Sequence, residues 1–527
     1  MIVSIAGATG SMGPYVVGEL LKIPQISCIR ILAHRKKPAR KLFRRFSAEH
    51  GRLDVFYGTI ASADDCRRLI EGASYVINMA AVIPPRSDKH PREAIEANEE
   101  GPKALVHAIE EADDQPKLIH ISTVGLYGHR NHIHPFGRVG DPLLISPFDL
   151  YALTKLRGEF TVLESDVNEW AVIRQTAMLY DDMLMNNIRD GLMFHTCFNG
   201  PLEWATGHDS GVLIANIVRR DMKGELNGEN FWKKCFNLGM AQNRVTGYET
   251  LDKGFRMIGG SVEVFFDPDY NSARNFHGMW FSDGQVLEEL FHYQQEKIDD
   301  FWAHVLRARP YLALGKIAPK KLVRKLVIER LRGDSNAPLY WYRHRDQARM
   351  TAYFKSEEDY RSIPETWDCY PLLCKGQSPD GAVDYDELRK RDTPAYYGFD
   401  FSKPDHEIDI SDLRSVAEAH GGALLCDRFQ TGDMYARVKW MTQDGEVFSA
   451  RPYTVLRCGH WYHISYREYA WEFDRLSRKD RVFAGIWRDS HDPDEQMRYW
   501  FDGNFEAGCA RQDAESADGT ESVEGKS

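Results

Sequence analysis

The chain of 527 residues is 43% hydrophobic and carries a formal net charge of −11; this length predicts about three structural units, and the charge disfavours a general nucleic-acid surface. No run of about 18 apolar residues occurs, so no membrane-spanning helix is expected, and the first predicted strand leaves no room for a signal peptide. Nine scattered cysteines without a disulfide-like framework favour a reducing, cytoplasmic location.

A glycine-rich turn follows the first predicted strand, residues 2–5. Gly7, Gly10 and Gly13 have the spacing G-x-x-G-x-x-G, and an apolar helical run covers residues 15–21. Glycine lets the backbone approach a pyrophosphate closely, and the following helix N-terminus supplies N–H donors. The pattern predicts dinucleotide binding, with an ordinary strand–helix turn as the alternative.

The second predicted strand, residues 29–33, runs into a basic turn. NAD-binding proteins commonly place a carboxylate here to hold the ribose hydroxyls, but this turn reads His34-Arg35-Lys36-Lys37. A 2′-phosphate prefers cations, and arginine can hold it through two hydrogen bonds. The turn therefore favours NADP over NAD, with Arg35 and Lys36 as contacts; a solvated basic loop is the structural alternative.

Hydroxyl groups follow a buried strand predicted over residues 117–121. Ser122 and Thr123 would lie at its carboxyl end, where open parallel sheets bind ligands. Further along, Tyr151 and Lys155 have the spacing Y-x-x-x-K, which puts both side chains on one face of a helix. The lysine charge would lower the tyrosine pKa and make the phenol a better proton donor and acceptor; an ordinary amphipathic helix is the alternative.

Taken in order, these motifs resemble the extended short-chain dehydrogenase/reductase family, also called the NAD-dependent epimerase/dehydratase family. The resemblance covers roughly residues 1–310. The matching segments are the glycine turn, Asn78-Met79-Ala80-Ala81, Asn98 within residues 96–101, Ser122 to Gly128, and the pair Tyr151 and Lys155.

The resemblance implies an α/β Rossmann fold, a doubly wound parallel sheet with a substrate lobe. It also implies that Thr123, Tyr151 and Lys155 are catalytic. The cofactor-binding residues expected are Gly7, Thr9, Gly10, Ser11, Met12, Gly13, Arg35, Lys36, Gly58, Thr59, Ile60, Met79, Ala80, Ala81, Asn98, Tyr151, Lys155 and Gln175. Three positions depart from the family pattern: Thr59 replaces an aspartate, Gln175 replaces a proline, and Val124-Gly125 replaces the Asp-Glu pair of dehydratases.

The function expected is hydride transfer between a nicotinamide and a carbonyl or alcohol carbon of a small-molecule substrate. A nucleotide-sugar epimerase with retained NAD is the first alternative. The second is a cofactor-binding scaffold that presents the C-terminal module to a protein partner. A homodimer is compatible with each of these functions.

A helical and irregular connector is predicted over residues 311–400. Before it, residues 285–306 are predicted to form one helix that closes the substrate lobe. Within the connector, residues 320–332 have one apolar face beneath a basic one. We expect this helix to pack on its own domain, and contact with a membrane surface is the less favoured alternative.

Residues 401–510 are predicted to form a smaller α+β module, followed by a disordered acidic tail over residues 511–527. The module has a helix over 411–420 and a hairpin around Asp444-Gly445. It is similar to a zinc-ribbon or treble-clef repeat, but its four ligand positions hold Met441, Glu446, Tyr462 and Ser465. We therefore expect no metal. The rival zinc set consists of Cys369, Cys374, Cys458, His460 and His463.

Overall fold

A seven-stranded parallel sheet forms the centre of the N-terminal part. The computed structural model describes residues 1–181, 183, 190–377, 387, 398–461 and 470–500. In the sheet the strand order is β10-β7-β5-β4-β1-β2-β3. The strands are β1 (Ile2–Ala6), β2 (Cys28–Ala33), β3 (Leu53–Tyr57), β4 (Ala73–Asn78), β5 (Lys117–Thr123), β7 (Trp170–Gln175) and β10 (Lys234–Leu238). The order reverses between β1 and β4, which opens a ligand crevice at their carboxyl ends.

Helices cover both faces of this sheet. One face carries α1 (Gly13–Leu21), α9 (Gly207–Asp221) and α12 (Gln285–Phe291), and the other carries α3 (Ala63–Ile70), α6 (Gly101–Glu110) and α7 (Leu150–Leu163). The remaining elements of this part are α2 (Lys36–Arg45), η1 (Ser47–Arg52), α4 (Arg86–Lys89), α5 (Pro91–Ile95), η2 (Glu96–Glu100) and η3 (Val124–Tyr127). Apolar strands such as β1 and β5 are buried because both faces are covered. The predicted doubly wound Rossmann fold is confirmed.

Three short strands and several helices build the lobe beside the crevice. Its strands are β8 (Ala177–Leu179), β9 (Pro201–Thr206) and β11 (Arg244–Thr246), with β6 (Phe136–Gly137) paired to β12 (Trp280–Phe281). Its helical elements are η4 (Gly191–His195), η5 (Ala241–Asn243), α10 (Gly247–Met257), α11 (Val262–Phe265), η6 (Pro268–Tyr270) and α13 (Ile298–Ala308). The single helix expected over 285–306 is wrong, because α12 ends at Phe291 and His292 adopts the left-handed conformation with φ 49°.

The described residues between 310 and 377 form short helical elements joined by irregular segments. These elements are η7 (Pro310–Lys316), α14 (Lys320–Val323), η8 (Arg324–Ile328), α15 (Glu329–Leu331), α16 (Pro338–His344), α17 (Gln347–Phe354), α18 (Glu357–Ser362) and η9 (Leu373–Lys375). Ile328 and Leu331 are buried in a cluster with α10 and α11, while Trp341 and Tyr353 join a cluster beside α7. The connector therefore packs on the N-terminal part and contributes side chains to two of its hydrophobic clusters.

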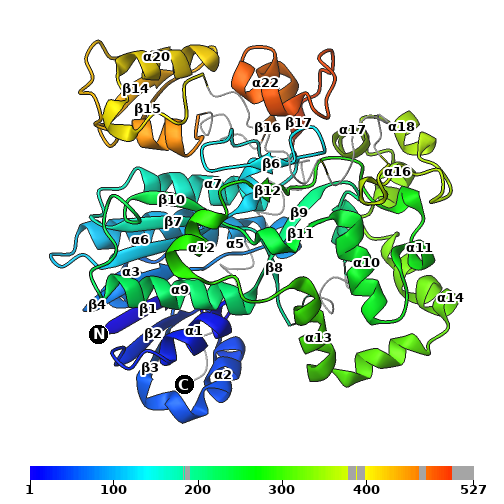
Figure 1. Ribbon diagram of the computed structural model, residues 1–527, viewed down its shortest axis with the longest axis horizontal. Coiled ribbons are helices and arrows are strands. Elements are labelled where there is room, and N and C mark those ends of the chain that lie inside the picture. Colours follow the sequence, from blue (N-terminus) through cyan, green and yellow to red (C-terminus); the bar gives the residue numbers. More distant parts are fainter. Residues whose placement is uncertain (182, 184–189, 378–386, 388–397, 462–469, 501–527) are drawn as a thin grey trace, which may run out of the picture.

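The C-terminal part lies against α7 and β10, shown in yellow to orange in Figure 1. Its elements are η10 (Asp405–Glu407), α20 (Ile410–Ala419), β13 (Ala423–Leu424), β14 (Val438–Met441), β15 (Val447–Ala450), η11 (Tyr453–Arg457), β16 (Ala470–Trp471), α21 (Phe473–Ser477), α22 (Arg481–Trp487) and β17 (Tyr499–Trp500). The hairpin is present, and Gly445 has the φ of +83° that its turn requires. Trp440, Phe448 and Trp461 share one core cluster with α3, α6 and α7.

None of the helices in the described part of the chain is long and apolar enough to cross a membrane. The predicted acidic tail, residues 511–527, lies outside the described residues.

Candidate active site

A cavity of about 550 Å³ lies at the carboxyl ends of the central strands. It opens between the glycine turn, the ends of β5 and β7, and the start of α7. Of the residues predicted from the sequence, the cavity is lined by Gly7, Gly10, Ser11, Met12, Met79, Ala81, Thr123, Tyr151, Lys155 and Gln175. The crevice at the strand-order reversal is therefore a real cavity that combines the glycine turn with the Y-x-x-x-K helix.

Glycine is sterically required at two positions of the turn. Gly7 has φ +88°, and a Cβ there would lie 2.5 Å from the backbone carbon of Met79. At Gly13 a Cβ would lie 2.0 Å from the carbonyl oxygen of Ala8. The turn thus packs directly on β4 and on itself, and the N-terminus of α1 faces the cavity, a geometry that fits a pyrophosphate.

Two hydroxyl side chains reach the cavity from β5. Thr123 caps η3, and its Oγ1 accepts a hydrogen bond from the N–H of Gly125 at 3.1 Å. The Ser122 hydroxyl is buried and has no hydrogen-bond partner among the described residues. Such a group gains most when a ligand supplies its partner.

Tyr151 and Lys155 occupy the first half of α7. The carboxylate of Asp149 caps this helix by accepting from the N–H of Ala152 at 2.9 Å. Burial raises the pKa of Tyr151 to about 12, against the lowering effect of a hydrogen bond with Thr123. Burial also lowers the pKa of Lys155 to about 8, and its Nζ donates to the carbonyl of Ile121 at 2.6 Å.

Gln175 ends β7 and pairs with Thr123 at the end of the neighbouring strand β5. Its Oε1 accepts from the Ser210 hydroxyl at 3.4 Å, whereas its Nε2 is buried without a partner in the described part of the chain. An amide donor in the wall of the cavity that also contains Tyr151 suits a polar ring substituent such as a carboxamide. The glycine cradle, the two unpartnered polar atoms and the buried phenol together fit a nicotinamide dinucleotide.

The far wall of the cavity comes from segments that carried no sequence signal. His195, Asn275, His277 and Tyr353 line it, together with Met178, Met183, Leu192, Met193, Trp204 and Phe276. Nδ1 of His277 lies 2.9 Å from Oδ2 of Asp149, and burial lowers the pKa of His195 to about 4. No motif marks these residues, because they approach the cavity from three separate parts of the chain.

The charges around the cavity are few. Lys155 is the only lysine or arginine among the described residues that line it, and two carboxylates, Asp88 and Asp149, line it as well. Burial, together with the charge of Asp149, raises the pKa of Asp88 to about 6. The cavity is therefore poorly suited to a multiply charged anion beyond the glycine turn.

Several predicted cofactor residues lie outside this cavity. These are Thr9, Gly13, Arg35, Lys36, Gly58, Thr59, Ile60, Ala80 and Asn98. Asn98 is buried and holds the chain in place, since its Oδ1 accepts from the N–H of Val82 at 2.8 Å. The carboxylate of Asp65 accepts from the N–H of Thr59 at 2.9 Å, so an aspartate from α3 lies beside the position where the family places one.

A carboxylate from a distant part of the chain lies beside the basic turn after β2. Nη2 of Arg35 lies 3.6 Å from Glu93 of α5, and the Arg35 side chain is half exposed. Glu93 also accepts hydrogen bonds from Arg86. Arg35 thus remains accessible to a ligand while being held by a distant acid.

A buried ionic network joins α7 to the C-terminal part. Arg174 forms hydrogen bonds with both carboxylate oxygens of Glu159, the shortest at 2.6 Å. Nε2 of His460 lies 2.9 Å from Glu159, and Arg174 donates to the carbonyl of Cys458 at 2.7 Å. Burial would raise the pKa of Glu159, but the charge of Arg174 and the contact with His460 outweigh it and hold this pKa far below its usual range.

The described members of the rival zinc set do not gather into a group of metal ligands. Cys458 and His460 face the N-terminal part, Cys369 is exposed, and Cys374 packs beside α10 and α11. His463, Tyr462 and Ser465 lie outside the described residues.

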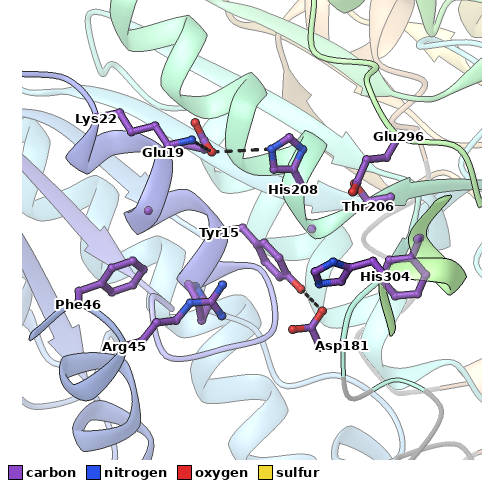
Figure 2. Close-up of a pocket in the computed structure, with 14 residues that line it drawn as sticks. Tyr15, Glu19, Lys22, Arg45, Phe46, Asp181, Thr206, His208, Glu296 and His304 are labelled. Carbon is purple, nitrogen blue, oxygen red and sulfur yellow. Dashed lines mark hydrogen bonds and ion pairs between the residues drawn. The ribbon is translucent and has the colours of Figure 1, made fainter. Parts of the chain in front are cut away.

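A second cavity of about 400 Å³ lies between α1 and α9. Figure 2 shows Tyr15 bonded to Asp181 on one side and His208 facing Glu19 on the other. His208, Asp209 and Glu296 form the only group of metal-ligand type found in the described part of the chain. Asp209 already accepts from the backbone N–H groups of Gln295 and Glu296, and it lies in the first turn of α9, at a helix N-terminus that repels cations. The polar side chains around this second cavity are thus explained by their contacts within the protein, and we assign no ligand to it.

Residues 3–169 match the model of the NAD dependent epimerase/dehydratase family, which confirms the resemblance over that part of the chain. Among solved structures, DesIV, a dTDP-glucose 4,6-dehydratase from Streptomyces venezuelae, has a TM-score of 0.47 and 17% identity, covering 59% of this chain and 97% of its own. Pal from Bacillus thuringiensis has a TM-score of 0.45 and 16% identity over 59% and 100%. UDP-glucuronic acid 4-epimerase from Bacillus cereus has a TM-score of 0.43 and 18% identity over 58% and 99%. No curated protein matches the chain significantly.

Proposed function

We propose that the protein is an NAD(P)-dependent oxidoreductase that acts on a carbonyl or alcohol carbon of a small, uncharged molecule. The observation that carries the proposal is the cavity in which the glycine turn, Thr123, Tyr151 and Lys155 meet. The family matched by residues 3–169 is NAD-dependent, which supports the same chemistry.

Each polar group has a role that follows from its position. The bound nicotinamide supplies the hydride chemistry. The phenol of Tyr151 donates a proton to the substrate oxygen during reduction and removes it during oxidation, and the Thr123 hydroxyl orients that oxygen. Lys155 stabilises the phenolate and holds the ribose hydroxyls. The Gln175 amide and the Ser122 hydroxyl, both buried with unpartnered atoms, orient the nicotinamide ring.

The lining of the cavity favours an uncharged substrate over a nucleotide sugar. A diphosphate needs cationic partners, whereas Lys155 is the only lysine or arginine among the described lining residues and two carboxylates oppose an anion. The far wall is mostly apolar, with Trp204, Phe276 and several methionines. Val124 lines the cavity where a dehydratase would carry a carboxylate. Net redox chemistry therefore ranks above epimerisation with retained NAD.

Mass spectrometry of the small molecules that copurify with the protein tests this proposal directly. We expect a nicotinamide dinucleotide, and nicotinamide oxidation with hydrophobic aldehydes or ketones. Conversion of a nucleotide sugar with no net change in nicotinamide redox state would support the epimerase instead. Cofactor binding without turnover on either class of substrate would favour the scaffold.

We expect NADPH to bind more tightly than NADH, because the β2 turn presents Arg35 and Lys36. Arg35→Asp should weaken NADPH binding about tenfold or more, since a hydrogen bond to a charged group contributes about 1.5–3 kcal/mol. Glu93→Gln should strengthen it by releasing Arg35 from its ion pair. Fluorescence titration measures both effects, and Arg40→Asp on the same helix, where Arg40 is exposed, is the matched control. Tighter binding of NADH by the unmodified protein would contradict this expectation.

The C-terminal residues 401–510 are proposed to be a metal-free relative of the zinc-ribbon repeat. The aromatic core of Trp440, Phe448 and Trp461, packed edge to face, supports this view, because such packing replaces the folding energy that a structural zinc would contribute. A chelator should therefore leave the melting temperature unchanged, and elemental analysis should find zinc well below one ion per chain. Stoichiometric zinc that leaves together with the fold would refute the proposal.

A further inference from the structure

An exposed surface of apolar and basic side chains runs along residues 310–331, the segment of η7, α14, η8 and α15. We call it the basic–apolar surface. Its apolar members are Tyr311, Leu314, Ile317, Leu322 and Leu326, and its exposed cations are Lys316, Lys321, Lys325 and Arg330. In Figure 1 this segment lies at the periphery of the molecule, around the label α14.

The apolar side chains are concentrated here beyond ordinary scatter. Of the twelve large apolar side chains exposed in the described part of the chain, five lie between residues 311 and 326. Ile317 is 80% exposed and Leu314 is 62% exposed. Single exposed apolar residues need no explanation, but a group of them marks an interaction site.

Residues 310–331 are held to the rest of the protein by other side chains of the same segment. The exposed apolar side chains are therefore not needed for the protein core. Ile328 and Leu331 are buried in the cluster with α10 and α11, and Val323 and Val327 pack against that cluster. The expectation that this helix packs on its own domain is therefore met by one part of its apolar face. Leu322 and Leu326 are left facing solvent.

The charge of the surface is strongly positive. Residues 310–331 contain six lysines and arginines but one carboxylate, Glu329, and that carboxylate already binds Arg324 and Arg332. The exposed cations Lys316, Lys321, Lys325 and Arg330 pair with no carboxylate in the described part of the chain. The whole chain has a net charge of −11, so the positive charge of this segment is opposite in sign to that of the chain as a whole.

We infer that the basic–apolar surface binds the surface of a bilayer that contains anionic lipids. The apolar side chains enter the boundary between headgroups and acyl chains, and the interleaved lysines contact lipid phosphates. A second copy of the chain is the poorer occupant, because a two-fold interface would place these cations against themselves. Lysine is also depleted from interfaces between proteins.

The position of the basic–apolar surface is consistent with an apolar substrate in the cavity of the candidate active site. Leu312 of η7 packs against a cluster that contains Trp204, and Trp204 lines the large cavity. A bilayer bound here would lie close to the far wall of that cavity. This consequence rests on the proposed function, whereas lipid binding itself does not.

Vesicle cosedimentation of the full chain tests the inference without any activity readout. Vesicles of phosphatidylcholine alone are compared with vesicles that contain about a third phosphatidylglycerol. We expect binding to the anionic vesicles that falls as salt is raised. Leu314→Ser combined with Ile317→Ser should weaken it about tenfold or more. Lys321→Glu combined with Lys325→Glu should do the same, at about 1 kcal/mol per charge.

The matched control is Lys439→Glu combined with Val447→Ser, which makes the same chemical changes at exposed residues of the C-terminal hairpin. This control should bind vesicles like the unmodified chain. Equal binding by all variants, or no preference for anionic vesicles, would overturn the inference. So would light scattering that shows a dimer dissociated by Leu314→Ser and Ile317→Ser, since a second copy would then cover the surface.

Discussion

Tyr151→Phe is expected to lower turnover by about 10² or more while leaving nicotinamide binding intact. The substitution keeps the ring and removes the proton that the proposed mechanism transfers, and positioned acid–base groups contribute about 10²–10⁴ in rate. In the free protein burial raises the pKa of Tyr151 to about 12, so the phenol is protonated at neutral pH and ready to act as an acid. Steady-state kinetics with a substrate identified by the turnover assays proposed above, beside a fluorescence titration of the cofactor, measures both properties.

Tyr353→Phe is the matched control for this experiment. Tyr353 is also buried and also lines the cavity, but on its far wall. Loss of its hydroxyl removes a contact with His195, 3.5 Å away, and should change KM more than kcat. Unchanged turnover in Tyr151→Phe, or equal losses in both variants, would remove the specific role of Tyr151.

The second large effect is expected from Glu159→Gln, which should destabilise the fold by about 3–5 kcal/mol. The amide keeps the shape of the carboxylate but leaves the fully buried Arg174 charge uncompensated, and this is the costly way to break a buried ion pair. It also replaces the charged acceptor of His460 by a neutral amide oxygen, which accepts a weaker hydrogen bond. Denaturant unfolding measures the change. Asp64→Asn, at the exposed pair with Arg67, should cost at most about 1 kcal/mol.

The pH dependence of the free energy of unfolding provides a second, independent test of this prediction. The folded-state pKa of Glu159 is held below its usual range, so its contribution is fully present above the unfolded value of about 4.3 and is lost as pH falls below it. The difference in stability between the unmodified chain and Glu159→Gln should therefore shrink in acid. Replacing Glu159 and Arg174 together by methionine should restore much of the stability, because no charge is then left unpaired. A loss equal to that of Glu159→Gln would contradict the explanation.

The sequence by itself determined the parts of the molecule that depend on local rules. Gly7 and Gly13 sit where any Cβ would strike neighbouring backbone, so their spacing was sufficient to predict the turn. Helical spacing put Tyr151 and Lys155 on one face of α7, and both line the cavity. The Asp444-Gly445 hairpin also follows from turn chemistry within a few residues.

Local rules failed where a helix boundary depends on longer-range packing. The apolar periodicity over 285–306 predicted one helix, but the chain breaks at His292 because Tyr293 turns inward and donates to the carbonyl of Gly239. Apolar periodicity predicts that a residue is buried, but it does not predict which part of the protein covers that residue. The same limit applies to α14 and η8, where one apolar face is only half covered.

Only the tertiary structure decided which distant residues meet at the site. His195, His277 and Tyr353 complete the cavity from three separate segments, and Glu93 reaches Arg35 from another helix. His460 lies 301 positions from Glu159, yet their side chains are 2.9 Å apart. Such pairings depend on how the C-terminal part docks on α7, which is set by burial of a shared core. Burial of apolar surface is non-directional and requires no fixed spacing of residues in the chain. No sequence motif therefore predicts these long-range pairings.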